Sequence, residues 1–126
     1  MNQHGIILFG HGARDPRWKE PFERLAAKLR ASRGDQPVAL AFLELMSPDL
    51  PSAVASLADD GCDAVTVVPV FFGQGGHVRR DLPEIVETCR KAHPGVAVHC
   101  ATAVGEDDAV LQAVAEYCLR QTDHGA

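Results

Sequence analysis

The sequence predicts an α/β fold built on a parallel sheet, and three observations support this class. Four short apolar stretches alternate with four longer stretches whose apolar residues recur at helical spacing. The short stretches are rich in Val, Ile, Leu and Phe, the composition of strands that are buried on both faces. Turn-forming residues separate the elements, and no low-complexity linker interrupts them. Strands that alternate with helices favour right-handed crossovers and helices on both faces of one sheet.

The expected strands are residues 5–10, 38–43, 64–70 and 96–101. Two of them end alike. The first is followed directly by His11, and the third leads into the glycine-rich segment 73–76 and then His77. A histidine therefore stands after each of these two strands.

The first helix is expected at residues 16–32, where apolar side chains recur at Trp18, Phe22, Leu25 and Leu29. The second is expected to begin with Ser47 as N-cap and Pro48 in the first helical position, and to stop near Gly61.

The third helix is expected after the segment 73–76, with Leu82, Ile85, Val86 and Cys89 on its apolar side. Lys91 and His93 then lie near its carboxyl end, where positive charge suits the helix dipole. The fourth helix is expected to open at Glu106 or Asp107, with Leu111, Val114 and Cys118 on one face.

With four strands, the expected architecture is a three-layer sandwich with a flavodoxin-like strand order, 2-1-3-4. Strands 5–10 and 64–70 are then neighbours, and the chain reverses direction between them. Open α/β sheets bind ligands outside the carboxyl ends of their strands at such a reversal. The topology therefore predicts His11 and His77 at one crevice, with Glu44 on the same rim after strand 38–43.

Length and composition predict one ordinary globular domain that spans residues 1–126. The net charge of −5 argues against a nucleic-acid-binding protein, which needs a strongly basic face. The apolar stretch near the N-terminus is too short for a signal peptide or a membrane span.

The four cysteines form no C-x-x-C pair, which favours reduced thiols in the cytoplasm. Most of them are expected as small core residues: Cys62, Cys89, Cys100 and Cys118.

Two imidazoles and a carboxylate are a partial ligand set for a divalent transition metal. An imidazole with a pKa near 6.5 also exchanges protons around neutral pH. The residues leave plainer interpretations open. Each histidine alone would be an ordinary surface residue, and Glu44 would serve equally well as a carboxylate at a helix entry.

Other residues near the predicted rim also have two interpretations. The glycines at 73, 75 and 76 would let a large flat ligand approach the backbone. Phe71 and Phe72 would form an apolar wall or belong to the core. Three arginines would hold carboxylates or phosphates, or would simply be solvated: Arg14, Arg79 and Arg80.

Nucleotide binding is weakly supported. The segment 73–77 lacks the lysine and the Ser or Thr of a P-loop, and Val78 breaks the G-x-G-x-x-G pattern. The sequence therefore does not predict ATP-driven chemistry.

Three segments at the ends of the first three strands resemble the small sirohydrochlorin chelatases. They are residues 11–16 (HGARDP), 42–44 (FLE) and 68–78 (VPVFFGQGGHV). These class II, ATP-independent chelatases act in cobalamin and siroheme synthesis and are often described as CbiX-like. The resemblance runs from about Ile6 through the fourth helix. One departure from the family pattern is Ala13, where the family often has Ser.

The resemblance implies an enzyme that inserts Co²⁺ or Fe²⁺, or Ni²⁺ in some members, into sirohydrochlorin without a nucleotide. It implies His11 and His77 as the metal-binding and catalytic histidines, with Glu44 as a further catalytic residue. The substrate would then contact Arg14, Phe72, Gly75, Gly76, Arg79 and Arg80. Longer family members carry two copies of this domain, so a one-copy chain is expected to work as a cytoplasmic homodimer, without membrane or nucleic acid.

Two rival functions remain on the sequence alone. A non-enzymatic carrier of metal or tetrapyrrole would use the same pocket but would never release metallated product. A flavodoxin-like phosphate-binding or regulatory domain would bind nucleotide or flavin and ignore cobalt and iron; the missing phosphate loop counts against it.

Overall fold

The computed structural model describes residues 3–73 and 75–122, without the side chains of residues 76 and 77. The elements are β1 (Gln3–Gly10), the short 3-10 helix η1 (Pro16–Lys19), α1 (Glu20–Arg33), β2 (Val38–Phe42), α2 (Leu50–Asp59), β3 (Cys62–Pro69), α3 (Gly76–Ala92), β4 (Ala97–Cys100), the 3-10 helix η2 (Val104–Glu106) and α4 (Asp108–Thr122). Among these described helices, none is long and apolar enough to cross a membrane.

The strands form one parallel sheet in the order β2-β1-β3-β4, which confirms the predicted order. Near its centre, Leu8 of β1 lies opposite Leu40 of β2 and Val68 of β3. On the other side of β3, Val65 lies opposite Val98 of β4. Because all four strands run in the same direction, their carboxyl ends share one edge, which we call the carboxyl edge.

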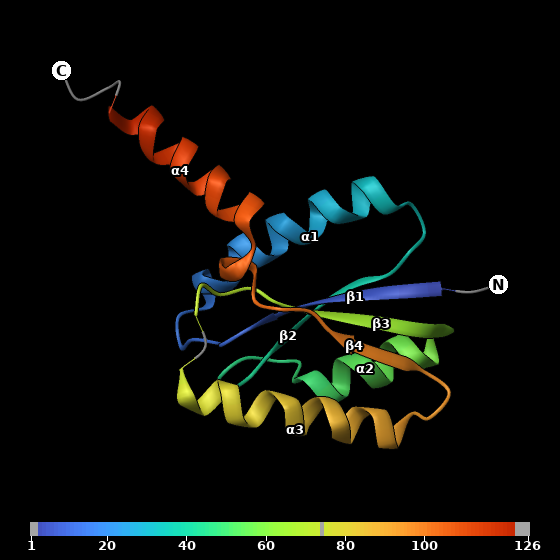
Figure 1. Cartoon of the computed structure of the whole chain (residues 1–126). Helices are drawn as coiled ribbons and strands as arrows, with labels where there is room; N and C mark the ends of the chain where they lie inside the picture. The colour runs from blue at the N-terminus through green and yellow to red at the C-terminus, as the bar shows by residue number, and fades with distance from the viewer. Residues whose placement is uncertain (1–2, 74, 123–126) are drawn as a thin grey trace.

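One face of the sheet is covered by α2 and α3 (Figure 1). Alternate residues of each strand point to this face and form the larger core cluster with both helices. Ile7 and Phe9 of β1, Val65 and Val67 of β3, and Val54 of α2 are completely buried there. We call this the sealed face.

The opposite face is covered by α1, which lies over β1 and β2. Phe22 of α1 packs against Leu8 and Phe42, and the rings of Phe22 and Phe42 stand edge-on with centroids 5.6 Å apart. Over β3 the cover is thinner, since Thr66 and Val68 are only half-buried. We call this the open face.

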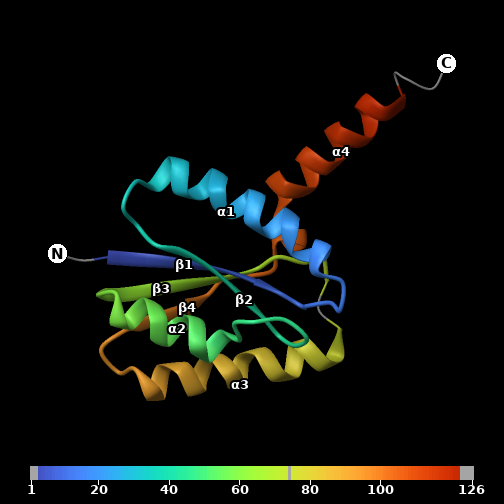
Figure 2. The ribbon, with the colours of Figure 1, turned by 180° about the vertical axis from the view of Figure 1, so that it is seen from behind.

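Helix α4 does not cover the sheet. It leaves the carboxyl edge and projects away from the body of the molecule (Figures 1 and 2). Every described residue of α4 is exposed except Val110, which is half-buried. Cys118 is therefore exposed and is the exception to the expectation that most cysteines lie in the core, since Cys62 and Cys89 are buried and Cys100 is half-buried.

Two predicted helix starts were wrong in detail. Helix α2 begins at Leu50 with Asp49 as N-cap, whose carboxylate accepts a 2.9 Å hydrogen bond from the Ser52 N–H. Ser47 and Pro48 instead belong to the loop after β2, where the Pro48 carbonyl accepts from the Phe42 N–H at 2.9 Å.

The expected helix 16–32 is divided in two. A 3-10 turn over Pro16–Lys19 is capped by the Asp15 carboxylate, which accepts a hydrogen bond from the Arg17 N–H at 2.9 Å. The α-helix starts only at Glu20, with Pro21 in its first turn. Proline has no N–H to donate, so the first turn of a helix accommodates it better than the interior does.

Candidate functional site

The loops that follow β1 and β2 are joined through their backbones. The Leu43 N–H donates to the Gly10 carbonyl at 2.9 Å, and the Glu44 N–H donates to the His11 carbonyl at 3.1 Å. Gly12 has a φ of 101°, and a Cβ there would collide with the Glu44 carbonyl oxygen. A glycine is therefore required at position 12 for the two loops to approach this closely.

This loop contact brings His11 and Glu44 together at the carboxyl edge. The His11 Nε2 lies 3.5 Å from the Glu44 Oε1, and the two side chains are 49% and 47% exposed. A carboxylate beside an imidazole can orient the ring. Both side chains also remain open to a ligand from solvent, so the pair can bind a cation or accept a proton.

His77 is the second residue of α3, which starts at the carboxyl edge beyond β3. Its backbone therefore follows the third strand, as the sequence predicts, but its side chain lies outside the described residues, as does Gln74. Among the described side chains, no three His, Cys, Asp or Glu residues gather closely enough to hold a metal ion. The convergence of His11 and His77 stays a prediction.

Phe71 and Phe72 have different environments. Phe71 is half-buried and packs against the sealed core, with its ring 6.4 Å from that of Phe9. Phe72 is 64% exposed. The sequence left two interpretations open for this pair. Phe71 fits the first, a core residue, and Phe72 fits the second, an exposed apolar wall.

The three candidate arginines, Arg14, Arg79 and Arg80, are all exposed. Arg79 and Arg80 lie in the first turns of α3, where the Arg79 N–H already donates to the Gly75 carbonyl at 3.0 Å. Gly73 and Gly75 face open space, since a Cβ at either position would meet nothing within 4 Å. Near the start of α3, the backbone at Gly75 and the side chains of Arg79 and Arg80 are therefore all accessible to a ligand.

Two residues near this edge were not singled out from sequence. Leu45 follows Glu44 with a φ of 67° and is 56% exposed. Gly105 packs on the backbone of Phe72, and its N–H donates to the Phe71 carbonyl at 3.1 Å. Gly105 could have been singled out from the sequence, because it is a glycine that comes shortly after the fourth expected strand. Leu45 had none, because nothing in a sequence marks a leucine for a left-handed backbone.

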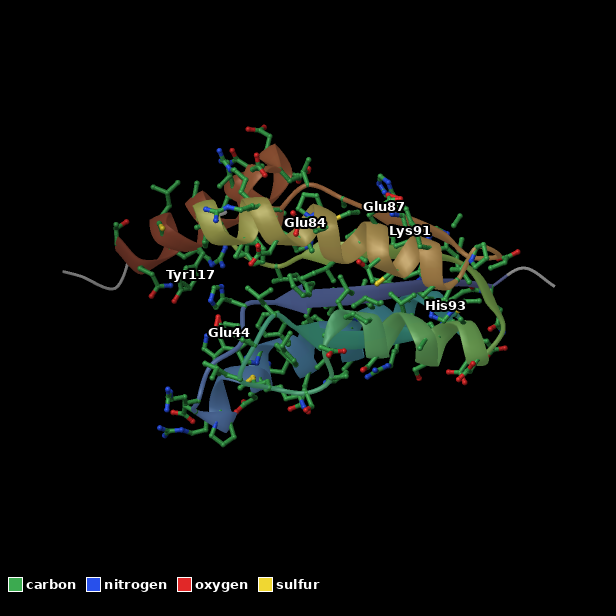
Figure 3. All side chains as sticks on the ribbon, turned by 90° about the horizontal axis from the view of Figure 1, so that it is seen from below. Glu44, Glu84, Glu87, Lys91, His93 and Tyr117 are labelled. Carbon is green, nitrogen blue, oxygen red and sulfur yellow. The ribbon has the colours of Figure 1, made fainter. Side chains whose placement is uncertain are left out.

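Viewed from below, Glu44 lies toward one end of the molecule with Tyr117 of α4, and Lys91 and His93 lie toward the other (Figure 3). A pocket of about 210 Å³ lies on the flank of α3, lined by Leu82, Pro83, Val86, Arg90 and Cys100. None of the predicted site residues lines this pocket. The His11–Glu44 pair therefore stands on an open edge of the single chain.

Comparison with known proteins places this chain in a family. A sequence model of the CbiX family matches residues 5–120. The sirohydrochlorin cobaltochelatase of Methanothermobacter thermautotrophicus is 37% identical over 82 residues, which are 65% of this chain and 57% of that protein. The chain thus spans little more than half the length of this relative. The sirohydrochlorin cobaltochelatase of Sulfurisphaera tokodaii is 29% identical over 113 residues, 90% of this chain and 89% of that one.

Solved structures show the same fold. A CbiX protein from Marinobacter aquaeolei VT8 superposes with a TM-score of 0.84 at 33% identity, over 96% of this chain and 98% of that one. SirB from Bacillus subtilis, solved with Fe³⁺, superposes with a TM-score of 0.79 at 23% identity, over 98% of this chain but 48% of its own. The SirB likeness concerns the fold alone. The match over residues 5–120 and the strand-end motifs agree, and the chain belongs to the CbiX family.

Proposed function

We propose that this protein inserts a divalent metal, Co²⁺ or Fe²⁺, into sirohydrochlorin without a nucleotide. The observation that carries the proposal is the half-exposed His11–Glu44 pair at the carboxyl edge of a CbiX-family sheet. Relatives of the chain are named sirohydrochlorin cobaltochelatase. Imidazole suits first-row transition metals, and a site that must release its metal benefits from few ligands.

Metallation removes two pyrrole N–H protons from the macrocycle while its nitrogens accept the metal. In our proposal, His11 and His77 hold the incoming ion at one face of the ring. Glu44, 3.5 Å from the His11 ring, orients this imidazole and would accept one pyrrole proton, and a neutral imidazole that the metal has left would accept the other. The metal then passes to the ring nitrogens and the histidines are left free.

The substrate has a flat apolar centre and carboxylates around its rim. Phe72, which is 64% exposed, and the open backbone at Gly75 would contact the macrocycle, together with Gly76. Arg14, Arg79 and Arg80 would bind the peripheral carboxylates. Charged groups at the rim of an acidic protein can attract a polyanion locally.

We further propose that the working unit is a cytoplasmic homodimer. The chain aligns with about half of the SirB chain. The His11 and Glu44 side chains are each about half exposed in the single chain, so a second copy would supply the wall that faces them.

The test is an anaerobic absorption assay of sirohydrochlorin with Co²⁺ and Fe²⁺ in separate reactions. We expect turnover of many equivalents of product. His11→Ala and His77→Ala should each abolish it without changing the far-ultraviolet circular dichroism, and Glu44→Gln should slow it. His93→Ala is the matched control, because His93 lies at the far end of the molecule from Glu44 (Figure 3).

Full activity in both histidine variants would reject their roles. Binding of one equivalent of metal or tetrapyrrole, with no release of metallated product, would instead identify a carrier.

A further inference from the structure

The loop after β2 holds an apolar residue in a backbone conformation that suits it poorly. Leu45 has a φ of 67°, and apart from glycines no other described residue has a positive φ. A left-handed backbone crowds the Cβ of an L-residue, and leucine has no polar side-chain atom that could offset this by a local hydrogen bond. Glycine would adopt the same φ without this cost. The turn alone therefore does not account for a leucine at this position.

The Leu45 side chain gains little from packing within the chain, since it is 56% exposed. Its neighbours in sequence have defined places. The Glu44 N–H donates to the His11 carbonyl at 3.1 Å, and Met46 packs against the core of the open face. The backbone around Leu45 is thus anchored on both sides, which holds the leucine at the carboxyl edge. Strained residues of this kind cluster at active sites and ligand clamps.

Exposed apolar side chains lie on both sides of the His11–Glu44 pair. Outside α4, the two most exposed large apolar side chains that the structure describes are Phe72, at 64%, and Leu45, at 56%. Leu45 follows β2, His11 follows β1 and Phe72 comes just beyond β3, so the sheet order β2-β1-β3 places the histidine between the other two. The distance from β2 to β3 is two strand spacings, or about 10 Å. A flat apolar ligand of that width would reach both side chains with its centre near His11.

We propose that the Leu45 side chain packs against the macrocycle of the tetrapyrrole on the β2 side of His11, opposite Phe72. The inference rests on the proposed function, since the ligand is the substrate named there, and it adds a binding residue to that site. The contact is the same before and after metallation. It therefore acts on the affinity for the tetrapyrrole and not on the rate of the chemical step.

The test measures the dissociation constant for metal-free sirohydrochlorin under anaerobic conditions, by quenching of the fluorescence of Trp18, the only tryptophan of the chain. Leu45→Gly and Leu45→Asn both suit the left-handed backbone but lack an apolar side chain, so each should raise this constant about tenfold. Leu45→Met keeps the apolar bulk and should stay within about twofold of the natural chain.

The matched control is Leu119→Asn. Leu119 is 65% exposed, but it lies on α4, which projects away from the body of the molecule (Figures 1 and 2). This change exchanges an equally exposed leucine for the same polar residue, and it should leave the dissociation constant unchanged.

Two further measurements separate binding from a structural role. The melting temperature of Leu45→Gly should stay close to that of the natural chain, because relief of the left-handed strain offsets the greater freedom of glycine in the unfolded chain. In steady-state metallation, Leu45→Gly should raise the KM for sirohydrochlorin about tenfold with little change in kcat. A residue that only held Glu44 in place would instead lower kcat and leave the dissociation constant as it is.

Three results would overturn the inference. Unchanged dissociation constants in Leu45→Gly and Leu45→Asn would mean that the side chain does not touch the tetrapyrrole. A clearly lower melting temperature in Leu45→Gly would mean that the side chain packs within the folded chain. Smaller species in sedimentation velocity of Leu45→Asn, with tetrapyrrole affinity restored at high protein concentration, would mean that Leu45 faces a second copy.

Failure of this inference differs from failure of the proposed function. A natural chain that metallates sirohydrochlorin, with an affinity insensitive to the residue at position 45, contradicts the inference alone. A natural chain that binds sirohydrochlorin and never turns it over contradicts the proposed reaction, and the Leu45 variants still test the contact. A natural chain that binds no sirohydrochlorin contradicts both.

Discussion

The two faces of the sheet differ in how completely they are covered. On the sealed face, α2 and α3 bury Ile7, Phe9, Val65 and Val67 completely. On the open face, α1 covers β1 and β2, while Val68 remains half-buried. The comparison shows that the core is sealed mainly from one side, while the other side and the carboxyl edge keep side chains accessible to solvent.

The largest expected effect contrasts two phenylalanines. Phe9→Ala would empty a completely buried position on the sealed face and should lower the free energy of unfolding by about 3–5 kcal/mol. Phe72→Ala, at a 64% exposed position, should change it by less than about 0.5 kcal/mol. Urea denaturation of both variants checks this. Similar losses would show that Phe72 is buried in solution by a contact with another copy.

A sharper comparison uses adjacent valines of β3, which point to opposite faces. Val67→Ala removes completely buried methyl groups and should lower the free energy of unfolding by about 2 kcal/mol. Val68→Ala, at a half-buried position, should cost about half as much when the protein is dilute. Urea denaturation of the two variants checks this, and equal losses would show that the open face covers Val68 as fully as the sealed face covers Val67.

The smallest expected effect concerns the cap of α2, on the sealed face. The Ser52 hydroxyl and backbone N–H hold the pKa of the Asp49 carboxyl below its ordinary value. The cap therefore contributes fully above the ordinary pKa of aspartate and is lost as the pH falls through the lowered pKa of the folded state. Asp49→Ala should cost about 1 kcal/mol at neutral pH.

Thermal unfolding across a pH series provides the measurement. The difference between the natural chain and Asp49→Ala should shrink as the pH drops through the acid range. Asp49→Asn is the control, because asparagine caps without a carboxyl group and should lose no stability from this site on acidification. A difference that stays constant at all pH values would contradict the assigned cap.

Much of the fold and part of the candidate site followed from local patterns. Apolar strands without alternation predicted the parallel sheet, and the sheet order is the one expected. His11 follows β1 and Glu44 lies just beyond β2. Because neighbouring parallel strands end at the same edge, His11 and Glu44, which are 33 positions apart in sequence, were expected on one rim, and the two side chains approach to 3.5 Å.

Other features depended on contacts that no local pattern contains. Asp49 rather than Ser47 caps α2, because the Phe42 N–H binds the Pro48 carbonyl and draws that segment into the loop. Leu45 adopts a left-handed backbone between Glu44 and that loop. Both outcomes require β2 and its loop to be in place first.

The direction of α4 separates the two kinds of information most clearly. Periodicity in the sequence was sufficient to predict the helix and the apolar face shared by Leu111, Val114 and Cys118, because both depend on residues within a few positions of each other. Where the helix points depends on Gly105 packing against Phe72, more than 30 residues earlier in the chain. Amphipathic periodicity specifies which residues share an apolar face, and long-range packing alone decides where that face points.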